Sequence, residues 1–339
     1  MNIGPGHPCF IIAEVSCSHV GSLRRAKQLV RDSAKAGADA VKFQMYGPWD
    51  MTLDVDHPAY RLKDTAWKGR RLWDLYEQAR TPTGWFPELF ELARSLGLVP
   101  FVSIFDPGHV SVTEALGMDL YKIASCEVAW LDLVRAAAGT GKPVILSDGM
   151  ASPKQLTAAL EVVGDQAILL RCVSEYPAKP ESYRLQNIRA LAGTGVRVGL
   201  SDHTTGTHTA VAAVALGACV VEKHIMSDHY WPWNQTLDKG HSVTPAAFGE
   251  MVSQIREIEA ALILPARMGQ PGAAGSSFRR RLVFRLDLDA GTVVDSEVDI
   301  AVVRCAEGWE PDWIDKIHGQ TLRDDVERGD PVTAGVIAV

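Results

Sequence analysis

The 339-residue sequence lacks the features that mark membrane, secreted and nucleic-acid-binding proteins. No apolar run approaches the roughly 18 residues that a membrane-spanning helix needs, so no membrane partner is expected. The first residues, MNIGPGHPCF, have neither the basic start nor the apolar core of a signal peptide, which makes the cytoplasm the expected location. Acidic residues outnumber basic ones by 41 to 34, so no excess of positive charge points to a nucleic-acid partner.

Cysteine is scattered and forms no CxxC pair, which excludes a readable zinc knuckle or disulfide framework. Hydrophobic residues make up 47% of the chain and charged residues 22%, as in folded globular proteins with a sizeable core. The length favours one large domain and a smaller one.

Eight short runs of apolar and β-branched residues predict strands, and stretches with helical spacing lie between most of them. The runs are FIIAEV (10–15), AVKFQ (40–44), VPFVSI (99–104), LYKIAS (120–125), PVILSD (143–148), AILLRC (167–172), VRVGLSD (196–202) and CVVEKH (219–224). Near-continuous apolar strands separated by helices indicate an α/β fold with a parallel sheet, and eight repeats suffice to close a (β/α)8 TIM barrel. A doubly wound open sheet is the alternative that this pattern leaves open.

Two stretches depart from the rhythm of strand and helix. Residues 45–84 form a long connection, which we expect to lie over the mouth of the barrel. The glycine- and proline-rich string LPARMGQPGAAGSSF indicates a domain boundary. The predicted organisation is a catalytic barrel over residues 1–270, a linker over 271–280 and a small strand-rich domain over 281–339.

Polar side chains close most of the predicted strands, at the end where barrel enzymes place their working residues. They are Glu14, Lys42, Gln44, Ser103, Lys122, Ser125, Ser147, Tyr176, Ser201, His203 and His224. We expect these side chains to converge on one cavity.

Two groups within this set suggest a chemistry. His203 and His224 would stand on neighbouring strands, where two imidazoles can share a divalent ion and leave coordination positions open. The alternative is that each histidine only forms hydrogen bonds at its strand end. Lys42 and Lys122, with the serines, would bind a phosphate and a carboxylate; the alternative is that the lysines form structural salt bridges with Glu14 and Glu127.

These residues lie in strings that resemble the N-acetylneuraminate (sialic acid) synthase family. The strings are IIAEVSCSHVGSL, GADAVKFQ, YKIASCE, GKPVILSDGM, SEYP, VGLSDHT and AVALGACVVEKH, in the family's order. The tail, LDLDAGTVVDSEVDIAVVR followed by WIDKIHGQTLRDDVERGDPV, is similar to that family's antifreeze-protein-like (SAF) domain. The resemblance thus covers nearly the whole chain.

The resemblance implies a transferase that condenses phosphoenolpyruvate with the aldehyde of an N-acylated sugar such as N-acetylmannosamine. The products would be a nine-carbon 2-keto-3-deoxy (nonulosonic) acid and phosphate. Phosphoenolpyruvate contacts are implied for Lys42, Ser103, Lys122, Ser125, Ser147 and Ser201, and sugar contacts for Gln44, Tyr176, Asp238 and Arg304. Glu14 would handle the attacking water, so the catalytic set is Glu14, Lys42, Lys122 and Tyr176.

The family also implies a metal and a partner. His203 and His224 match its metal ligands, with manganese expected and magnesium or cobalt as alternatives. Arg304 matches an arginine that reaches from the tail of one subunit into the barrel of the other, which implies a domain-swapped homodimer.

Departures from the family pattern cluster on the sugar side. The family's asparagine-histidine pair is Ser18-His19 here, and its STPF string is shortened to Ser103-Ile104-Phe105. The loop DHYWPWNQTLDKGH introduces Trp231 and Trp233 and has Lys239 where the family has histidine, and Arg304 is followed by CAEG. We therefore expect an acceptor that differs from N-acetylmannosamine in size, acylation or phosphorylation, although the tryptophans would alternatively pack between the domains.

Two other functions are compatible with the sequence. One is a metal-dependent barrel aldolase or lyase that does not use phosphoenolpyruvate. The other is a non-catalytic sugar-binding protein that shares the fold, since a fold does not dictate an activity.

Overall fold

A computed structural model describes residues 2–63, 67–228, 236–262 and 277–337. The chain divides into two compact units, Met1–Leu264 and Pro265–Val339. The predicted linker, 271–280, lies mostly outside the described residues, and the first strand of the second unit begins at Arg280, the last residue of that range.

The first unit is the predicted (β/α)8 barrel, in which eight parallel strands close into a ring in sequence order. The strands are β1 (Phe10–Glu14), β2 (Ala40–Met45), β3 (Val99–Ile104), β4 (Tyr121–Ile123), β5 (Val144–Ser147), β6 (Ala167–Cys172), β7 (Val198–Asp202) and β8 (Val220–His224). The ring closes where β8 pairs with β1, so the open sheet is excluded. This register places Glu14 between Lys42 of β2 and His224 of β8.

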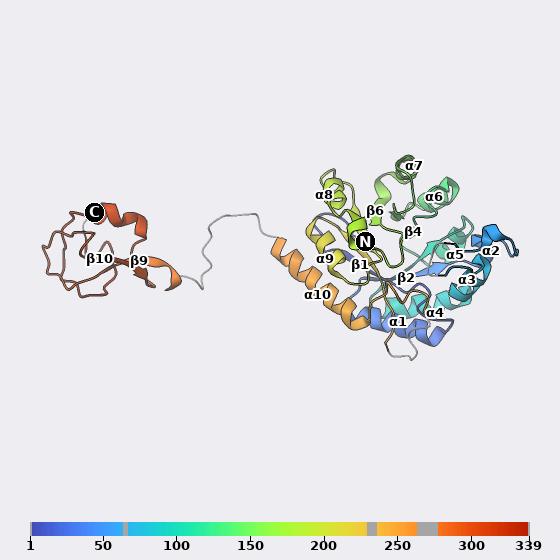
Figure 1. Ribbon diagram of the computed structural model, residues 1–339, viewed down its shortest axis with the longest axis horizontal. Coiled ribbons are helices and arrows are strands. Elements are labelled where there is room, and N and C mark those ends of the chain that lie inside the picture. The colour runs from blue at the N-terminus through green and yellow to red at the C-terminus, as the bar shows by residue number, and fades with distance from the viewer. Residues whose placement is uncertain (1, 64–66, 229–235, 263–276, 338–339) are drawn as a thin grey trace. The chain divides into compact units, whose positions relative to one another are not determined.

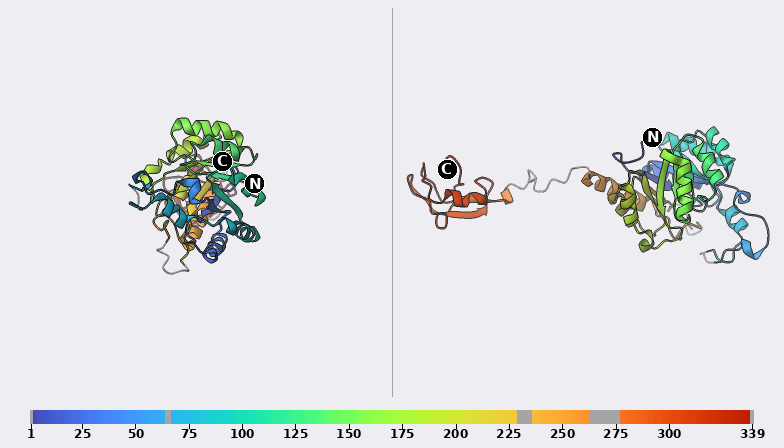
Figure 2. Two further views of the ribbon diagram at one scale, coloured as in Figure 1. Left: turned by 90° about the vertical axis from the view of Figure 1, so that its right-hand side faces the viewer. Right: turned by 90° about the horizontal axis from the view of Figure 1, so that it is seen from above.

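Helices surround the strands on the outside of the ring (Figures 1 and 2). They are α1 (Leu23–Lys35), α4 (Phe86–Ser95), α5 (His109–Ala115), α6 (Leu131–Ala138), α7 (Pro153–Val163), α8 (Gln186–Ala192), α9 (His208–Ala215) and α10 (Pro245–Leu262). Side-chain caps mark where two of them begin: Ser22 accepts a hydrogen bond from the backbone of Arg25, and Ser152 forms a capping box with Gln155.

The core lies between the strands and this outer layer of helices. Five strands, β1, β4, β5, β7 and β8, are buried along their whole length, as expected for a parallel sheet covered by helices. Gly199 in β7 is required there, because a Cβ atom would collide with the carbonyl oxygen of Val220 in β8. The close approach of β7 and β8 brings the strand ends that carry His203 and His224 together.

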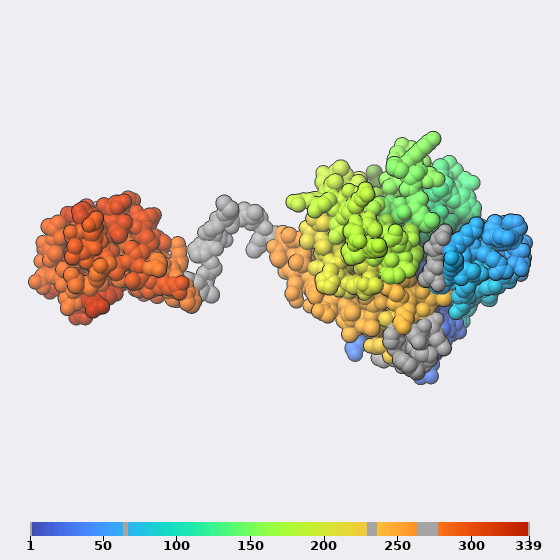
Figure 3. All heavy atoms as spheres, viewed as in Figure 1, coloured from blue at the N-terminus to red at the C-terminus, as the bar shows by residue number. Residues whose placement is uncertain are grey.

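The long connection after β2 contains α2 (Pro48–Met51), η1 (Pro58–Tyr60), α3 (Leu72–Ala79) and η2 (Thr83–Trp85). Figure 3 shows part of it, in blue, standing out at the edge of the barrel unit. Its apolar side chains Met51, Leu62, Leu72 and Leu75 line the cavity described below. The connection therefore contributes a wall to the mouth of the barrel.

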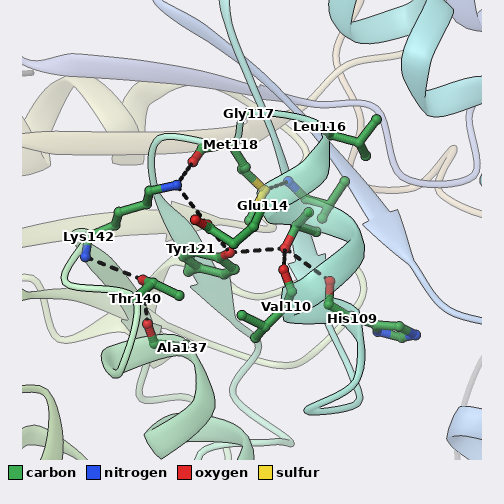
Figure 4. A network of polar contacts seen from close by, with 12 residues as sticks. His109, Val110, Glu114, Leu116, Gly117, Met118, Tyr121, Ala137, Thr140 and Lys142 are labelled. Carbon is green, nitrogen blue, oxygen red and sulfur yellow. Dashed lines mark hydrogen bonds and ion pairs between the residues drawn. The ribbon is translucent and has the colours of Figure 1, made fainter.

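A polar network ties α5 to the beginning of β4 and to the residues before β5 (Figure 4). The hydroxyl of Tyr121 donates to Glu114 Oε1 at 2.6 Å, and Lys142 Nζ donates to the same oxygen at 2.6 Å. Lys142 also donates to the carbonyl of Met118. Because Tyr121 is the first residue of β4, this network stabilises the end of the barrel opposite to the strand ends that carry the polar residues.

The second unit has its own small core and is built largely from short β pairings. Strands β9 (Arg280–Phe284) and β10 (Ile300–Arg304) are antiparallel, and η7 (Pro311–Trp313) and α11 (Ile314–Ile317) follow. Leu282, Phe284, Ile300, Ile317 and Val332 are among its buried residues. Within the described part of both units, no helix is long and apolar enough to cross a membrane.

Candidate active site

A cavity of about 420 Å³ opens at the carboxyl ends of the barrel strands. Nearly all of the polar residues singled out in the sequence line it, namely Glu14, Lys42, Gln44, Ser103, Lys122, Ser125, Ser147, Tyr176, Ser201, His203, His224 and Asp238. Arg304 belongs to the second unit, where it ends β10 and its guanidinium carbon lies 6.0 Å from the ring centre of Phe278. Trp231 and Trp233 lie outside the described residues.

Lys42 is the buried centre of an ionic cluster on the cavity floor. Its Nζ lies 2.8 Å from Glu14 Oε2 and 3.5 Å from Glu222 Oε2, and it donates to Ser103 Oγ at 3.1 Å. Burial alone would lower the pKa of Lys42, but the two carboxylates outweigh this effect and raise it. Lys42 is therefore a permanently charged group, and its pairing with Glu14 matches the salt-bridge alternative as well as a place in an anion site.

Lys122 is as buried as Lys42, but fewer negative groups balance the charge of its ammonium. Its ammonium donates to Ser147 Oγ and to the carbonyl of Ile123, and among the described residues it has no carboxylate within salt-bridge distance. Burial lowers the pKa of Lys122, and the attraction of Glu222 only partly offsets it. A bound anion would supply the charge that this ammonium lacks.

Glu222 is a member of the floor that the sequence analysis did not select. It accepts a hydrogen bond from Ser201 Oγ at 3.0 Å. Burial alone would raise its pKa, but Lys42 and Lys122 bring the pKa of Glu222 down to about 2. With two lysines and two carboxylates the floor is close to neutral. The string EKH could have pointed to this residue. Side chains two residues apart in a strand lie on the same face, so Glu222 shares the inward face of β8 with His224.

Three imidazoles and a carboxylate gather elsewhere in the lining of the cavity. The ring centre of His203 lies 5.3 Å from that of His224, and the ring of His241 lies 4.5 Å from the ring of His224. Asp238 Oδ2 accepts a hydrogen bond from His224 Nδ1 at 3.2 Å. Ligand atoms of His224, Asp238 and His241 all lie within 4.8 Å of one another.

The protonation states of this cluster suit a divalent cation. Burial lowers the pKa of His203 to about 3 and that of His241 to about 2, so both rings are neutral near pH 7. Burial would raise the pKa of Asp238, but the hydrogen bond and charge of His224 bring it below its usual value. Neutral imidazoles and an ionised carboxylate are the donors that manganese, iron and zinc accept.

Two hydrogen-bonding details complete the fit. His203 Nδ1 donates to the carbonyl of Val173 at 2.7 Å, which fixes the tautomer and leaves the lone pair on Nε2. Nε2 of His241 is buried and has no hydrogen-bond partner among the described residues. A metal ion would satisfy that nitrogen.

His241 is the second cavity residue that the sequence analysis did not single out. The sequence analysis named Lys239, which does not line the cavity. His241 does line it, and its backbone amide donates to the carbonyl of Asp238 at 3.2 Å, so that a turn brings the two residues together. Asp238, expected at the sugar, lies directly against His224. The spacing Asp-x-x-His was the available signal.

The rest of the cavity is aromatic and apolar. Tyr176 lies over His203 with 4.4 Å between the ring centres and 4.9 Å from the ring of His241. Tyr46 packs edge-on against Phe105 and Tyr76. Above the charged floor, the site thus has an apolar wall that suits methyl and methylene groups. Gln44 belongs to the floor, since its amide donates to Glu14 and to Ser16.

Fold and site together define the class: a (β/α)8 barrel whose cavity is lined by lysines, serines and a histidine cluster. The chain belongs to the NeuB family, whose pattern matches residues 29–264. It is 35% identical to the pseudaminic acid synthase of Campylobacter jejuni, over 97% of this chain and 96% of the relative. It is also 35% identical to the pseudaminic acid synthase of Helicobacter pylori, over 96% of this chain and 97% of the relative.

A solved structure agrees with this assignment. The N-acetylneuraminic acid synthetase of Leptospira borgpetersenii, crystallised with citrate, superposes with a TM-score of 0.71 at 29% identity. The match covers 81% of this chain and 91% of that one.

Proposed function

We propose that this chain condenses phosphoenolpyruvate with the open-chain aldehyde of an N-acylated amino sugar, giving a nonulosonic acid and inorganic phosphate. The observation that carries the proposal is one cavity lined both by Lys42 and Lys122 and by the cluster of His203, His224, Asp238 and His241. Membership of the NeuB family and the names of the relatives support it.

Phosphoenolpyruvate would bind on the floor. Lys122, which has no carboxylate partner among the described residues, would pair with the phosphate, and Ser125 and Ser147 would donate hydroxyl hydrogen bonds. Ser125 is linked to Ser174 by a hydrogen bond of 2.7 Å, which orients its hydroxyl. Lys42 and Ser103 would hold the other anionic end of the molecule.

In the chemical steps, an electron-rich atom attacks an electron-poor carbon twice. The methylene carbon of phosphoenolpyruvate attacks the aldehyde carbon, and the aldehyde oxygen takes up a proton from solvent and becomes a hydroxyl group. Positive charge develops at the enol carbon, and water adds there while its proton passes to Glu14. The resulting tetrahedral hemiketal phosphate loses phosphate by cleavage of its carbon–oxygen bond, and the keto acid forms. Lys42 and Lys122 stabilise the charge of the departing phosphate.

His203, His224 and His241, with Asp238, would hold a divalent metal, for which manganese is proposed. Such a metal would supply positive charge that polarises the aldehyde oxygen. This charge matters because the floor, with two lysines and the carboxylates Glu14 and Glu222, is nearly neutral by itself.

The acceptor is proposed to be a sugar of the pseudaminic acid series. One support is the pair of relatives named pseudaminic acid synthase. The second is the wall of Met51, Leu62, Leu72 and Leu75, which suits the methyl groups of acylated and deoxygenated positions better than hydroxyl groups. Gln44 and Tyr176 would contact the polar parts of the sugar.

The second unit is proposed to be an SAF-like domain that completes the site of a partner chain. The support is the resemblance of its sequence and the exposure of Arg304 at the end of β10. The assembly would be a domain-swapped homodimer in which Arg304 contacts the sugar.

The test is an assay with purified full-length protein, phosphoenolpyruvate and manganese, in which phosphate and keto acid are measured together. The acceptors are the aldehyde sugars of the pseudaminic and N-acetylneuraminic acid series, with a simple aldose as control. Equal amounts of phosphate and keto acid with the pseudaminic acceptor are expected. Keto acid without consumption of phosphoenolpyruvate would identify an aldolase, and an inert protein would contradict the proposal.

A further inference from the structure

A second ion pair lies behind the histidine cluster and takes no part in the chemistry above. Lys223 Nζ lies 3.2 Å from Asp202 Oδ2, and neither side chain is exposed at all. The two residues are direct neighbours in the register of β7 and β8, and each immediately precedes one of the cavity histidines. The pair therefore sits where two candidate metal-binding strand ends meet.

The two side chains point away from the cavity. Ser201 and His203 line the cavity from β7 and beyond, and Glu222 and His224 line it from β8, whereas Asp202 and Lys223 do not. Because successive side chains of a strand alternate between its faces, the ion pair lies in the layer between the barrel and the helices. Much of that layer is filled by apolar groups.

The ion pair holds the backbone at Thr204, the residue that follows His203. Asp202 Oδ1 accepts a hydrogen bond from the amide of Thr204 at 2.9 Å, and Lys223 Nζ donates to the carbonyl of Thr204 at 2.5 Å. On the N-terminal side, the hydroxyl of Tyr183 accepts a hydrogen bond from the amide of His203 at 2.7 Å and donates one to the carbonyl of Ser201 at 3.0 Å. The backbone that carries His203 is thus held from both sides.

Stability alone does not account for this arrangement. Removing two charges from water is costly, and apolar residues of similar volume often serve as well or better. What apolar residues cannot do is bond both the amide and the carbonyl of Thr204. The function left to the pair is to fix the backbone geometry.

We propose that Asp202 and Lys223 are positioning residues that hold the imidazoles of His203 and His224 at the spacing a divalent cation requires. The inference rests on the metal-binding role proposed above for these histidines. Outer-sphere partners of metal ligands typically change affinity by about 10- to 100-fold, and an effect of this size is expected here.

The experiment compares manganese binding by titration calorimetry in full-length protein freed of metal. The main variant is D202L/K223M, which replaces the charges with apolar groups. The control is K142M, which removes a half-buried lysine from the network at the opposite end of the barrel. D202N keeps the shape of the aspartate side chain and an oxygen that accepts from the amide of Thr204, and it replaces the double variant in the comparison if the double variant does not fold.

The expected result is a double variant that melts close to the wild type but binds manganese about 10- to 100-fold more weakly, with K142M unchanged. D202N would show a smaller loss in the same direction. Wild-type affinity in a folded double variant, or in D202N if only that variant folds, would overturn the positioning role while leaving the metal site intact. A wild-type protein that binds no manganese would instead overturn the metal site and, with it, this inference.

Discussion

Asp238 and His224 lie in contact, with 3.2 Å between Oδ2 of the carboxylate and Nδ1 of the ring. The other oxygen of the carboxylate lies 3.7 Å from Nε2 of His241. One carboxylate thus joins two imidazoles that come from different parts of the polypeptide, the end of β8 and the loop after it. This contact places Asp238 beside the candidate metal ligands, and the sugar contact that the resemblance implied for it stays a prediction.

His241→Ala is expected to weaken manganese binding by about tenfold or more, the scale on which even outer-sphere partners of metal ligands act. The reason is that its buried Nε2 has no hydrogen-bond partner among the described residues, and that a ring nitrogen of His241 lies within 4.8 Å of ligand atoms of His224 and Asp238. Calorimetric titration of the metal-free protein measures the effect. His318→Ala, which changes an exposed histidine of the second unit, is the control. Equal affinity in His241→Ala and the control would remove His241 from the metal site.

The two lysines are expected to behave differently when changed to methionine. Lys42→Met leaves Glu14 and Glu222 buried without their partner, so it should lower the free energy of unfolding by about 3–5 kcal/mol. Lys122→Met removes a cation with no carboxylate at salt-bridge distance among the described residues and should be less destabilising.

Denaturant unfolding measures the stability of both variants, and steady-state kinetics of Lys122→Met measures binding. Its KM for phosphoenolpyruvate should rise by about tenfold or more, since a charge-assisted contact contributes about 1.5–3 kcal/mol. An unchanged KM would mean that Lys122 does not contact phosphoenolpyruvate.

The barrel and most of its cavity could be predicted from the sequence because both depend on local alternation. Glu14, Lys42 and His224 end apolar strands, and parallel strands present their carboxyl ends at one edge of the ring. Once the strands were placed, the meeting of these side chains followed from the fold.

The places of His241 and Glu222 in the cavity depend on loop geometry and on distances between side chains, which strand periodicity does not give. His241 lies on a loop, and its position is set by a turn with Asp238 rather than by strand periodicity. Glu222 was visible as a strand-end residue, but its part in the floor became clear only from its distance to Lys42. Charge balance in a cavity is a property of three-dimensional distances, and sequence order does not contain them.

Glu14→Gln is expected to lower kcat by about 10²- to 10⁴-fold, the usual contribution of a general base. Gln44 would still donate to the side chain at this position, so the KM for phosphoenolpyruvate should change little. The comparison of kcat with KM separates loss of a base from loss of a binding group. Turnover at the wild-type rate would remove the role assigned to Glu14.

Leu72→Asn is expected to raise the KM for the acceptor by about tenfold without changing the KM for phosphoenolpyruvate. Leu72 lies on the apolar wall, and a misplaced polar group in such a wall costs about 1–3 kcal/mol. Kinetics with each substrate varied in turn measures both constants. Leu96→Asn, at an exposed leucine that does not line the cavity, is the control. A rise in both constants would show that the wall does not face the sugar.

The most direct test of the account follows the oxygen that bridges carbon and phosphorus in phosphoenolpyruvate. With this oxygen labelled as ¹⁸O, addition of water at the enol carbon and cleavage of the carbon–oxygen bond predict that the label leaves in inorganic phosphate. Mass spectrometry of the phosphate and of the keto acid measures its fate. Label retained in the keto acid, or no phosphate released while the keto acid forms, would contradict the proposed chemistry.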